Sequence, residues 1–413
     1  MTSTAQPKIA ISSPALAALL AGLSAIGPFS IDAYLPSMEE IGLELGVTPL
    51  AVQQTLTAYM VPFALMTLWH GSISDALGRR RVVLWGMALF GLASIACACA
   101  TSLTALLVFR CLQGATAGAG MVVGRAIVRD LFHGAEAQRV MAQVTISFAI
   151  APAVAPVIGG WLHVWFGWRA VFGFLVLFTA VCWGLCLRVL PETLAPERRQ
   201  PLHPIYLARS YWSVLLSVPF VGACLCVTLN FTGFFIYVMS APVFLMEYLH
   251  VSATGFFWLF GPLTLGMAGG AWLSGRVAGR LSPVRTMMWS YVLMGGAAGA
   301  NLLYHFLRPP ALPWSVAPLF FFVFGAALCY PSLTLLALDL FPTKRGLAAS
   351  CQSFAQTGGA AINAIIAPLL WGSMRTLALA QVVALALGLS GLLIYLWTAK
   401  ITEAAPPIET PIQ

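Results

Sequence analysis

Residues 169–190 read RAVFGFLVLFTAVCWGLCLRVL, an apolar stretch whose only charges, Arg169 and Arg188, lie near its two ends. At 1.5 Å per residue, a stretch of this length crosses the roughly 30 Å hydrocarbon core of a bilayer as a helix. Similar runs recur along the 413 residues, of which 60% are hydrophobic and 8% charged. Soluble domains carry about 25% charged residues. The sequence therefore predicts an all-α membrane protein.

The apolar runs predict twelve transmembrane helices, six on each side of a polar gap. We expect them near 14–36, 51–73, 82–101, 104–127, 140–162, 169–190, 214–240, 254–275, 286–306, 315–338, 347–370 and 377–398. The gap is rich in proline and charge, which is typical of a connecting segment. We therefore expect an N-terminal six-helix bundle at 1–190, a cytoplasmic linker at 191–213, a C-terminal six-helix bundle at 214–398 and a disordered tail at 399–413.

The basic residues indicate how the chain crosses the membrane. With a cytoplasmic N-terminus, 16 of the 21 Lys and Arg residues fall in inner segments. Arg169, Arg308 and Arg375 alone fall in outer loops, and Arg110 and Arg125 lie within a helix. Cytoplasmic loops carry the excess of basic residues in membrane proteins. We expect a multi-pass protein of the cell inner membrane with both termini in the cytoplasm.

Other classes of protein fit the sequence poorly. The net charge of +8 is spread over short gaps between apolar runs and forms no basic face for nucleic acid. The nine cysteines lie in apolar runs without the partner residues of a zinc site. No G-x-x-x-x-G-K-[ST] loop for ATP and no nucleophile–base cluster at membrane depth is present. We expect neither an enzyme nor a cofactor nor a metal.

A charged turn follows the second apolar run. It reads GSISDALGRRR, with Gly71, Asp75, Gly78, Arg79, Arg80 and Arg81. Glycine permits a sharp bend, and a carboxylate beside guanidinium groups makes charge-assisted bonds. Such a turn is a conformational gate in one interpretation. In the other, the arginines only follow the positive-inside rule and the acid is a solvated neighbour.

Several segments resemble one transporter family. The turn at 71–81 resembles motif A of the major facilitator superfamily, and LLVFRCLQGATAGAG at 106–120 is similar to its motif B. APAVAPVIGG at 151–160 resembles the antiporter motif C through Pro152, Pro156, Gly159 and Gly160. SIDAYLPSM at 30–38 and PETLAPERRQPLH at 191–203 resemble the Bcr/CflA subfamily of drug:proton antiporters. The resemblance implies two six-helix bundles that rock about a central site.

Motif C departs from the family pattern at Ala151 and Ala155, where glycine is usual. Alanine is small, so we still expect close helix packing there.

A proton site is expected at Asp32, which alone among the acidic residues sits clearly inside a span. A carboxylate in hydrocarbon is costly and normally marks a pathway or a proton relay. The rise of 1.5 Å per residue places Arg110 in the outer half of the membrane as well. The pair therefore predicts proton coupling, with a purely structural ion pair as the alternative. The resemblance implies the same roles for both residues.

A substrate cavity is expected around the proton site. Gln113 shares a helix face with Arg110, one turn away. Aromatic and amide side chains suit an adaptable pocket for varied apolar ligands, although each is also consistent with core or lipid contact. The candidates are Tyr34, Tyr59, Gln113, Asn230, Phe234, Tyr237, Gln352 and Gln356.

These features together predict a proton-driven multidrug exporter for small apolar or amphipathic compounds. A nutrient uptake symporter or a metabolite exporter on the same fold is the alternative, since fold does not decide function. The expected partners are drug-like small molecules, protons and membrane lipids, without nucleic acid. We expect the chain to function as a monomer.

Overall fold

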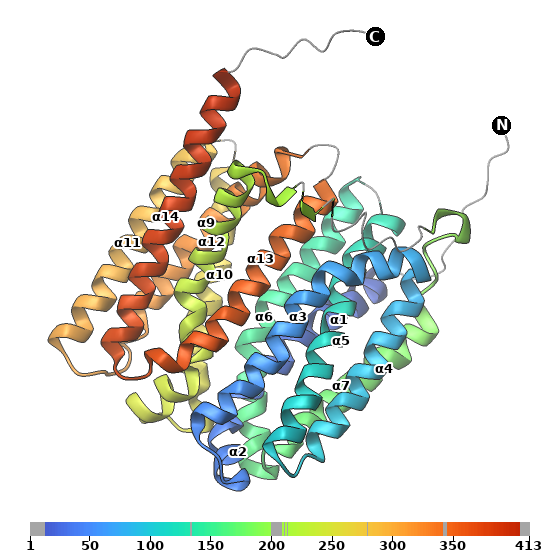
Figure 1. The fold of residues 1–413 in the computed structure, drawn as a ribbon, viewed down its shortest axis with the longest axis horizontal. Helices are drawn as coiled ribbons and strands as arrows, with labels where there is room; N and C mark the ends of the chain where they lie inside the picture. The colour runs from blue at the N-terminus through green and yellow to red at the C-terminus, as the bar shows by residue number, and fades with distance from the viewer. Residues whose placement is uncertain are drawn as a thin grey trace.

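A computed structural model describes residues 13–132, 134–199, 209, 211–212, 214–278, 280–341 and 345–404. Within these ranges the chain forms twelve long helices and no sheet (Figure 1). The expected all-α architecture is confirmed.

The first half of the chain contributes six long helices and one short one. Their bounds are α1 Ser13–Asp32, α2 Met38–Leu45, α3 Pro49–Leu77, α4 Arg79–Ala98, α5 Leu103–Leu131, α6 Gly134–Phe166 and α7 Arg169–Val189. A 3-10 turn, η1 Leu35–Ser37, joins α1 to the short α2.

The second half contributes six more long helices. Their bounds are α9 Val218–Met239, α10 Phe257–Val277, α11 Pro283–Leu307, α12 Ala317–Asp339, α13 Arg345–Ile366 and α14 Met374–Ala404. Short turns η3 Val243–Tyr248 and η4 Ala253–Phe256 connect α9 to α10, and η5 Ala367–Leu370 connects α13 to α14. Helix α14 runs past the expected end at residue 398, and 405–413 lie outside the described residues.

Among the described residues, 9 helices are long and apolar enough to cross a membrane. The other long helices, α3, α6 and α11, pack beside them against α5, α1 and α12. Large apolar side chains such as Trp85, Leu177 and Trp289 are more than 60% exposed. An exposed apolar surface of this kind suits lipid rather than water.

The first helix ends earlier than the apolar run predicts. We expected a helix to residue 36, but α1 ends at Asp32 and a turn leads into η1. Pro36 explains the break, because a proline inside a helix clashes with the carbonyl four residues earlier, here that of Asp32. Several other helices, such as α3 and α6, are longer than their apolar runs. Hydropathy marks only the part in hydrocarbon, whereas backbone hydrogen bonds continue into the interface.

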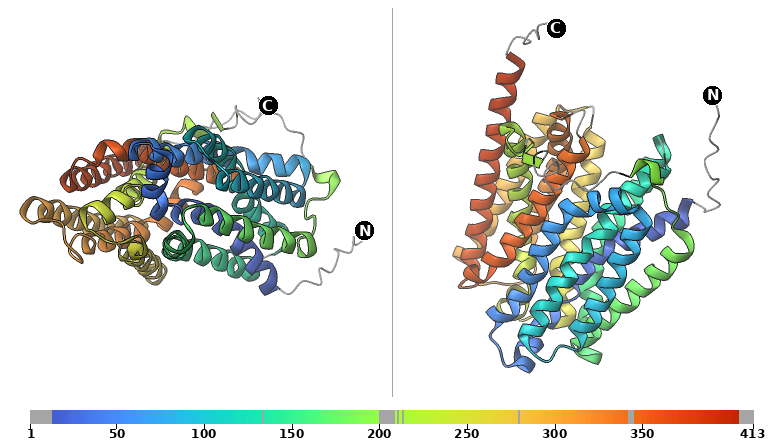
Figure 2. Two further views of the ribbon diagram at one scale, coloured as in Figure 1. Left: turned by 90° about the horizontal axis from the view of Figure 1, so that it is seen from below. Right: turned by 45° about the vertical axis from the view of Figure 1, so that its right-hand side comes forward.

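The two groups of helices lie side by side and meet along two lines (Figure 2). Helix α3 contacts α13, and α6 contacts α10 and η4. We call α1–α7 the N-terminal bundle and α9–α14 the C-terminal bundle. The end that carries the α3–α4 turn, expected to face the cytoplasm, is the inner end, and the end with α2 and η4 is the outer end.

Candidate functional site

Arg110 on α5 is fully buried inside the N-terminal bundle. Its Nη1 donates to the backbone oxygen and the hydroxyl of Ser30, each at 3.2 Å, and to Gln113 Oε1 at 2.6 Å. The rings of Tyr34 and Tyr59 lie against the guanidinium, with centroids 4.7 and 4.4 Å from its central carbon. Aromatic faces attract a cation at this range. A positive charge is thus held at membrane depth by neutral groups.

Close packing of α5 on α3 brings Tyr59 to this arginine. Gly114 lies against the backbone of Tyr59, so that a Cβ at this position would clash with it. The residue before it, Gln113, is held at both ends of its amide, since its Oε1 accepts from Arg110 and its Nε2 donates to Ser94 Oγ at 2.8 Å. Tyr34 is oriented in the same way by a 2.7 Å hydrogen bond with Thr55. Gly114 and the hydroxyl groups of Ser94 and Thr55 therefore hold in place the side chains that surround Arg110.

Asp32 lies at the C-terminal end of α1 and is 4% exposed. The described residues include no ion pair between Asp32 and Arg110 in this conformation, and Arg110 binds Ser30 and Gln113 instead. The acid and the arginine nevertheless share one region, because Ser30 precedes Asp32 by two residues on α1.

The predicted residues Tyr34, Tyr59 and Gln113 all surround Arg110, where each is 0% exposed. They form the shell of the arginine in this conformation. Ser30 and Ser94 were not predicted to belong to the site. Ser30 lies two residues before Asp32, the acid that sits clearly inside a predicted span, and this proximity could have identified it. Nothing in the sequence distinguishes Ser94 from other serines.

The α3–α4 turn forms a compact charge cluster at the inner end. Arg79 contacts Asp75 at 2.5 Å and Asp130 at 3.2 Å, and its Nη1 donates to Ser74 Oγ at 2.6 Å. Asp130, at the end of α5, also accepts from the Thr193 hydroxyl at 2.8 Å. The turn is therefore tied to a second helix and to the chain that follows α7.

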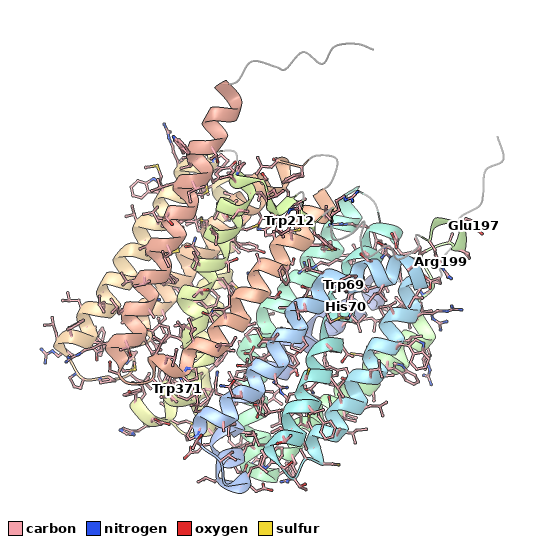
Figure 3. All side chains as sticks on the ribbon, viewed as in Figure 1. Trp69, His70, Glu197, Arg199, Trp212 and Trp371 are labelled. Atoms are coloured by element: carbon pink, nitrogen blue, oxygen red, sulfur yellow. The ribbon has the colours of Figure 1, made fainter. Side chains whose placement is uncertain are left out.

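Gly78 allows that chain to approach the turn. Its φ of 101° lies in a region that favours glycine, and a Cβ here would collide with the Glu192 carboxylate. Glu192 accepts from the backbone N–H of Arg79 at 2.9 Å. Arg199 lies next to the same turn (Figure 3). The acids Asp130 and Glu192 were missed as partners, because one ends a helix and the other lies in the predicted linker.

Other members of the motif contribute less. Arg80 donates to the backbone oxygen of Leu187 at 2.8 Å, and Arg81 is exposed. A Cβ at Gly71 would meet only Val122, at an ordinary 3.9 Å. Of the residues predicted to form a gate, Asp75, Gly78 and Arg79 therefore make the closest contacts in this cluster.

The segment 151–160 lies on α6, with Pro152 and Pro156 inside the helix. Its two glycines face different neighbours. A Cβ at Gly159 would clash with the backbone of Ala33, the residue after Asp32, and one at Gly160 would clash with Ala253 in η4. Helix α6 therefore touches the break in α1 with one glycine and the C-terminal bundle with the next.

A hydrogen bond also joins the bundles at the outer end. Gln53, at the start of α3, donates to the backbone oxygen of Ala364 on α13 at 3.4 Å. Together with the contact of Gly160, it links the bundles on both of the lines along which they meet. The outer ends of the two bundles are in contact.

The candidates on α9 point into the C-terminal bundle. Asn230 accepts from the Tyr291 hydroxyl at 3.1 Å, and the Tyr237 hydroxyl accepts from Asn301 at 2.7 Å. Phe234 packs edge to face against Phe231, with centroids 4.9 Å apart. These side chains are buried among their own helices in this conformation.

The candidates on α13, Gln352 and Gln356, are one turn apart and lie close to the middle of their helix. Gln352 donates to the Thr334 hydroxyl at 3.1 Å, whereas half-buried Gln356 accepts a 3.5 Å hydrogen bond from Tyr330. Both partners lie on α12. No group of three His, Cys, Asp or Glu residues that would hold a metal occurs in the part of the chain that the structure describes.

Comparison with known proteins agrees with this architecture. Residues 17–364 match the Major Facilitator Superfamily. An uncharacterised transporter of this type, YdgK of Bacillus subtilis, is 33% identical over 81% of this chain and 84% of its own length. Multidrug resistance protein D of Escherichia coli is 29% identical over 85% of this chain and 88% of its own.

The fold is also similar to that of solved transporters. The crystal structure of the human organic anion transporter MFSD10 superposes with a TM-score of 0.67 at 19% identity, covering 94% of this chain and 100% of that one. The resemblance that the motifs at 71–81, 106–120 and 151–160 indicated is thereby confirmed. The chain belongs to the major facilitator superfamily of membrane transporters.

Proposed function

We propose that this protein exports small apolar or amphipathic drug-like compounds in exchange for protons. The observation that carries the proposal is the buried pair of opposite ionisable groups in the outer half of the N-terminal bundle. Asp32 has no cationic partner among the described residues, and Arg110 has no anionic one. An acid that gains or loses a proton beside such an arginine changes the local charge at membrane depth.

The structure suggests how that change reaches the other bundle. Deprotonation of Asp32 favours an approach by Arg110, whose Nε and Nη2 have no hydrogen-bonding partner among the described residues. Such a movement pulls on the end of α1, and Ala33 rests on Gly159. The next glycine contacts η4 of the C-terminal bundle. Opposite movements of two packed bundles expose a central site to each side in turn.

Drug export is supported over nutrient uptake by two features. The relative multidrug resistance protein D is matched along most of its length. The polar groups of the candidate residues Asn230, Gln352 and Gln356 are amides, which bind neutral groups without selecting a charged nutrient. The cluster around Arg79 acts in this proposal as the inner gate, and Gly159–Gly160 as the outer one.

We further propose an oligomeric state and an orientation in the membrane. The chain works as a monomer in the inner membrane, with both termini in the cytoplasm and lipid around the exposed apolar side chains. The start of α1 and the end of α14 lie at the same end of the molecule (Figure 2), as an even number of spans requires.

The test is proton release in energised inverted vesicles that contain the full chain. Chloramphenicol, bicyclomycin and a cationic dye are added in turn, and lumenal pH is followed. The parent protein is expected to dissipate the proton gradient when a substrate is added, and Asp32→Asn is expected to remove this response. Glu39→Gln is the matched control, because Glu39 is an exposed acid on α2. Unchanged proton release by Asp32→Asn contradicts the proposed coupling site.

A further inference from the structure

The outer half of the C-terminal bundle holds a second polar cluster, in which the predicted cavity residue Tyr237 meets side chains that the proposed transport cycle does not use. The cluster joins Tyr237 on α9, Asn301 on α11 and Gln381 on α14, and His305 lies one turn beyond Asn301 on the same helix. The first three are 0% exposed, and His305 is 4% exposed. Asn301 Nδ2 donates to the Tyr237 hydroxyl at 2.7 Å and to Gln381 Oε1 at 2.8 Å. One amide therefore connects three helices.

The cluster is not complete by itself. Four of its atoms have no hydrogen-bonding partner among the described residues, namely Asn301 Oδ1, Gln381 Nε2 and both ring nitrogens of His305. Asn301 and His305 are four residues apart on α11 and share one face of the helix. Buried polar groups in proteins are almost always paired, with another protein group or with ordered water. Within a membrane the cost of leaving them unpaired is higher still.

The unpaired atoms match the hydrogen-bonding chemistry of water. A neutral imidazole has one donor and one acceptor, so the four atoms offer two donor atoms and two acceptor atoms. Water both donates and accepts hydrogen bonds, and more than one molecule is needed because the two ring nitrogens of His305 point away from each other. A metal ion is a poor fit, since the described residues contain no group of His, Cys, Asp or Glu that would hold one. The guanidinium of Arg375 also opposes a cation, because its Nε donates to the His305 backbone oxygen at 3.2 Å.

The N-terminal bundle supplies an independent comparison. There the first and third long helices, α1 and α4, carry Ser30 and Ser94, and the space between them is filled by Arg110 and Gln113. In the C-terminal bundle the corresponding helices α9 and α11 carry a tyrosine and an asparagine at a similar distance from their ends, without an arginine. The place that the guanidinium takes in the N-terminal bundle therefore has no charged side chain from α9 or α11 in the C-terminal bundle.

We propose that this cluster is a water-binding site, entered from the outer face beside His305, which lies two residues before the end of α11. Ordered water completes the hydrogen bonding of Asn301, Gln381 and His305. It thereby keeps α9, α11 and α14 together as one rigid unit while the bundles move.

Radiolytic hydroxyl-radical labelling of the full chain in lipid nanodiscs tests the site, because bound water generates radicals next to otherwise inaccessible side chains. Tyr237 and His305 are expected to be oxidised at least fivefold faster than Phe220 and Phe322, which are also buried in this bundle at 0% exposure. Oxidation of all four residues at the same slow rate overturns the proposal.

A double variant, Asn301→Leu with Gln381→Leu, supplies a second measurement. A hydrated cluster predicts that the oxidation of Tyr237 falls to the rate of Phe322. A dry cluster predicts that the oxidation rate of Tyr237 is the same in the variant and the parent, because no bound water is removed. If the double variant does not fold, the same reading is taken on Gln381→Met. Neither measurement involves transport, so failure here leaves the proposed export function untouched.

Discussion

Gly160 allows a direct measurement of how the outer ends of the two bundles are held together. In Gly160→Ala the new Cβ would fall too close to the Ala253 carbonyl oxygen, 3.1 Å from its carbon and 3.3 Å from Thr254 Cα. All three are backbone atoms, so no side chain can rotate away. Overpacking of this kind costs about 1–3 kcal/mol. Because the clash exists only while the outer ends touch, that cost shifts the equilibrium toward outward opening by roughly 5- to 150-fold.

The shift is measured as a distance between spin labels at residues 43 and 369. Leu43 on α2 and Leu369 in η5 are 78% and 80% exposed and belong to opposite bundles at the outer end. The exposed cysteines Cys99 and Cys111 are first replaced by serine. Double electron–electron resonance should then show a longer-distance population in Gly160→Ala.

Two control variants separate this effect from a general loss of packing. Gly173→Ala on α7 has nothing within 4 Å of its new Cβ and should leave the distances unchanged. Gly159→Ala strains the contact with Ala33 inside one bundle, so it should alter proton coupling more than outer opening. A distance distribution in Gly160→Ala that matches the parent refutes the reasoning.

Three further variants test the packing and the charge clusters. Gly114→Ala drives a Cβ into the backbone of Tyr59, and we expect a loss of about 1–3 kcal/mol, seen as a lower melting temperature; an unchanged value contradicts the packing argument. Asp130→Asn removes one of the two acids that form ion pairs with the Arg79 guanidinium among the described residues. For this partly exposed pair we expect roughly fivefold slower transport with unaltered drug binding, and a parental rate would exclude a gating role. Glu44→Gln breaks a half-exposed ion pair at the outer end and should cost less than about 1 kcal/mol, an effect that high salt removes.

The site illustrates which parts of a transporter can be inferred before its structure is known. Asp32 and Arg110 stand out in the sequence because charge inside an apolar run is rare. Their companions Ser30 and Ser94 do not, because serine is common in helices and its role depends on what lies opposite. An ion pair between the acid and the arginine was expected from their similar depth. Depth does not determine which way a side chain points, and here Arg110 points toward Ser30 and Gln113.

The roles of the glycines in the α3–α4 turn could not be inferred from the sequence either. Gly71 and Gly78 look alike in the motif, yet a Cβ at the first would meet only an ordinary contact, whereas the second has a φ of 101° and lies against Glu192. The sequence could not show that the residues after α7 return to this turn.

The sequence by itself determined the number of long helices, their order and the family, because hydropathy, basic loops and short motifs are local properties of the chain. The tertiary structure alone decided which glycine faces which bundle and which polar groups of the described residues remain unpaired. Those properties depend on contacts between helices that are far apart in the chain, such as Gly160 with Ala253 and Asn301 with Gln381. No local pattern encodes them, because each arises only when two surfaces meet.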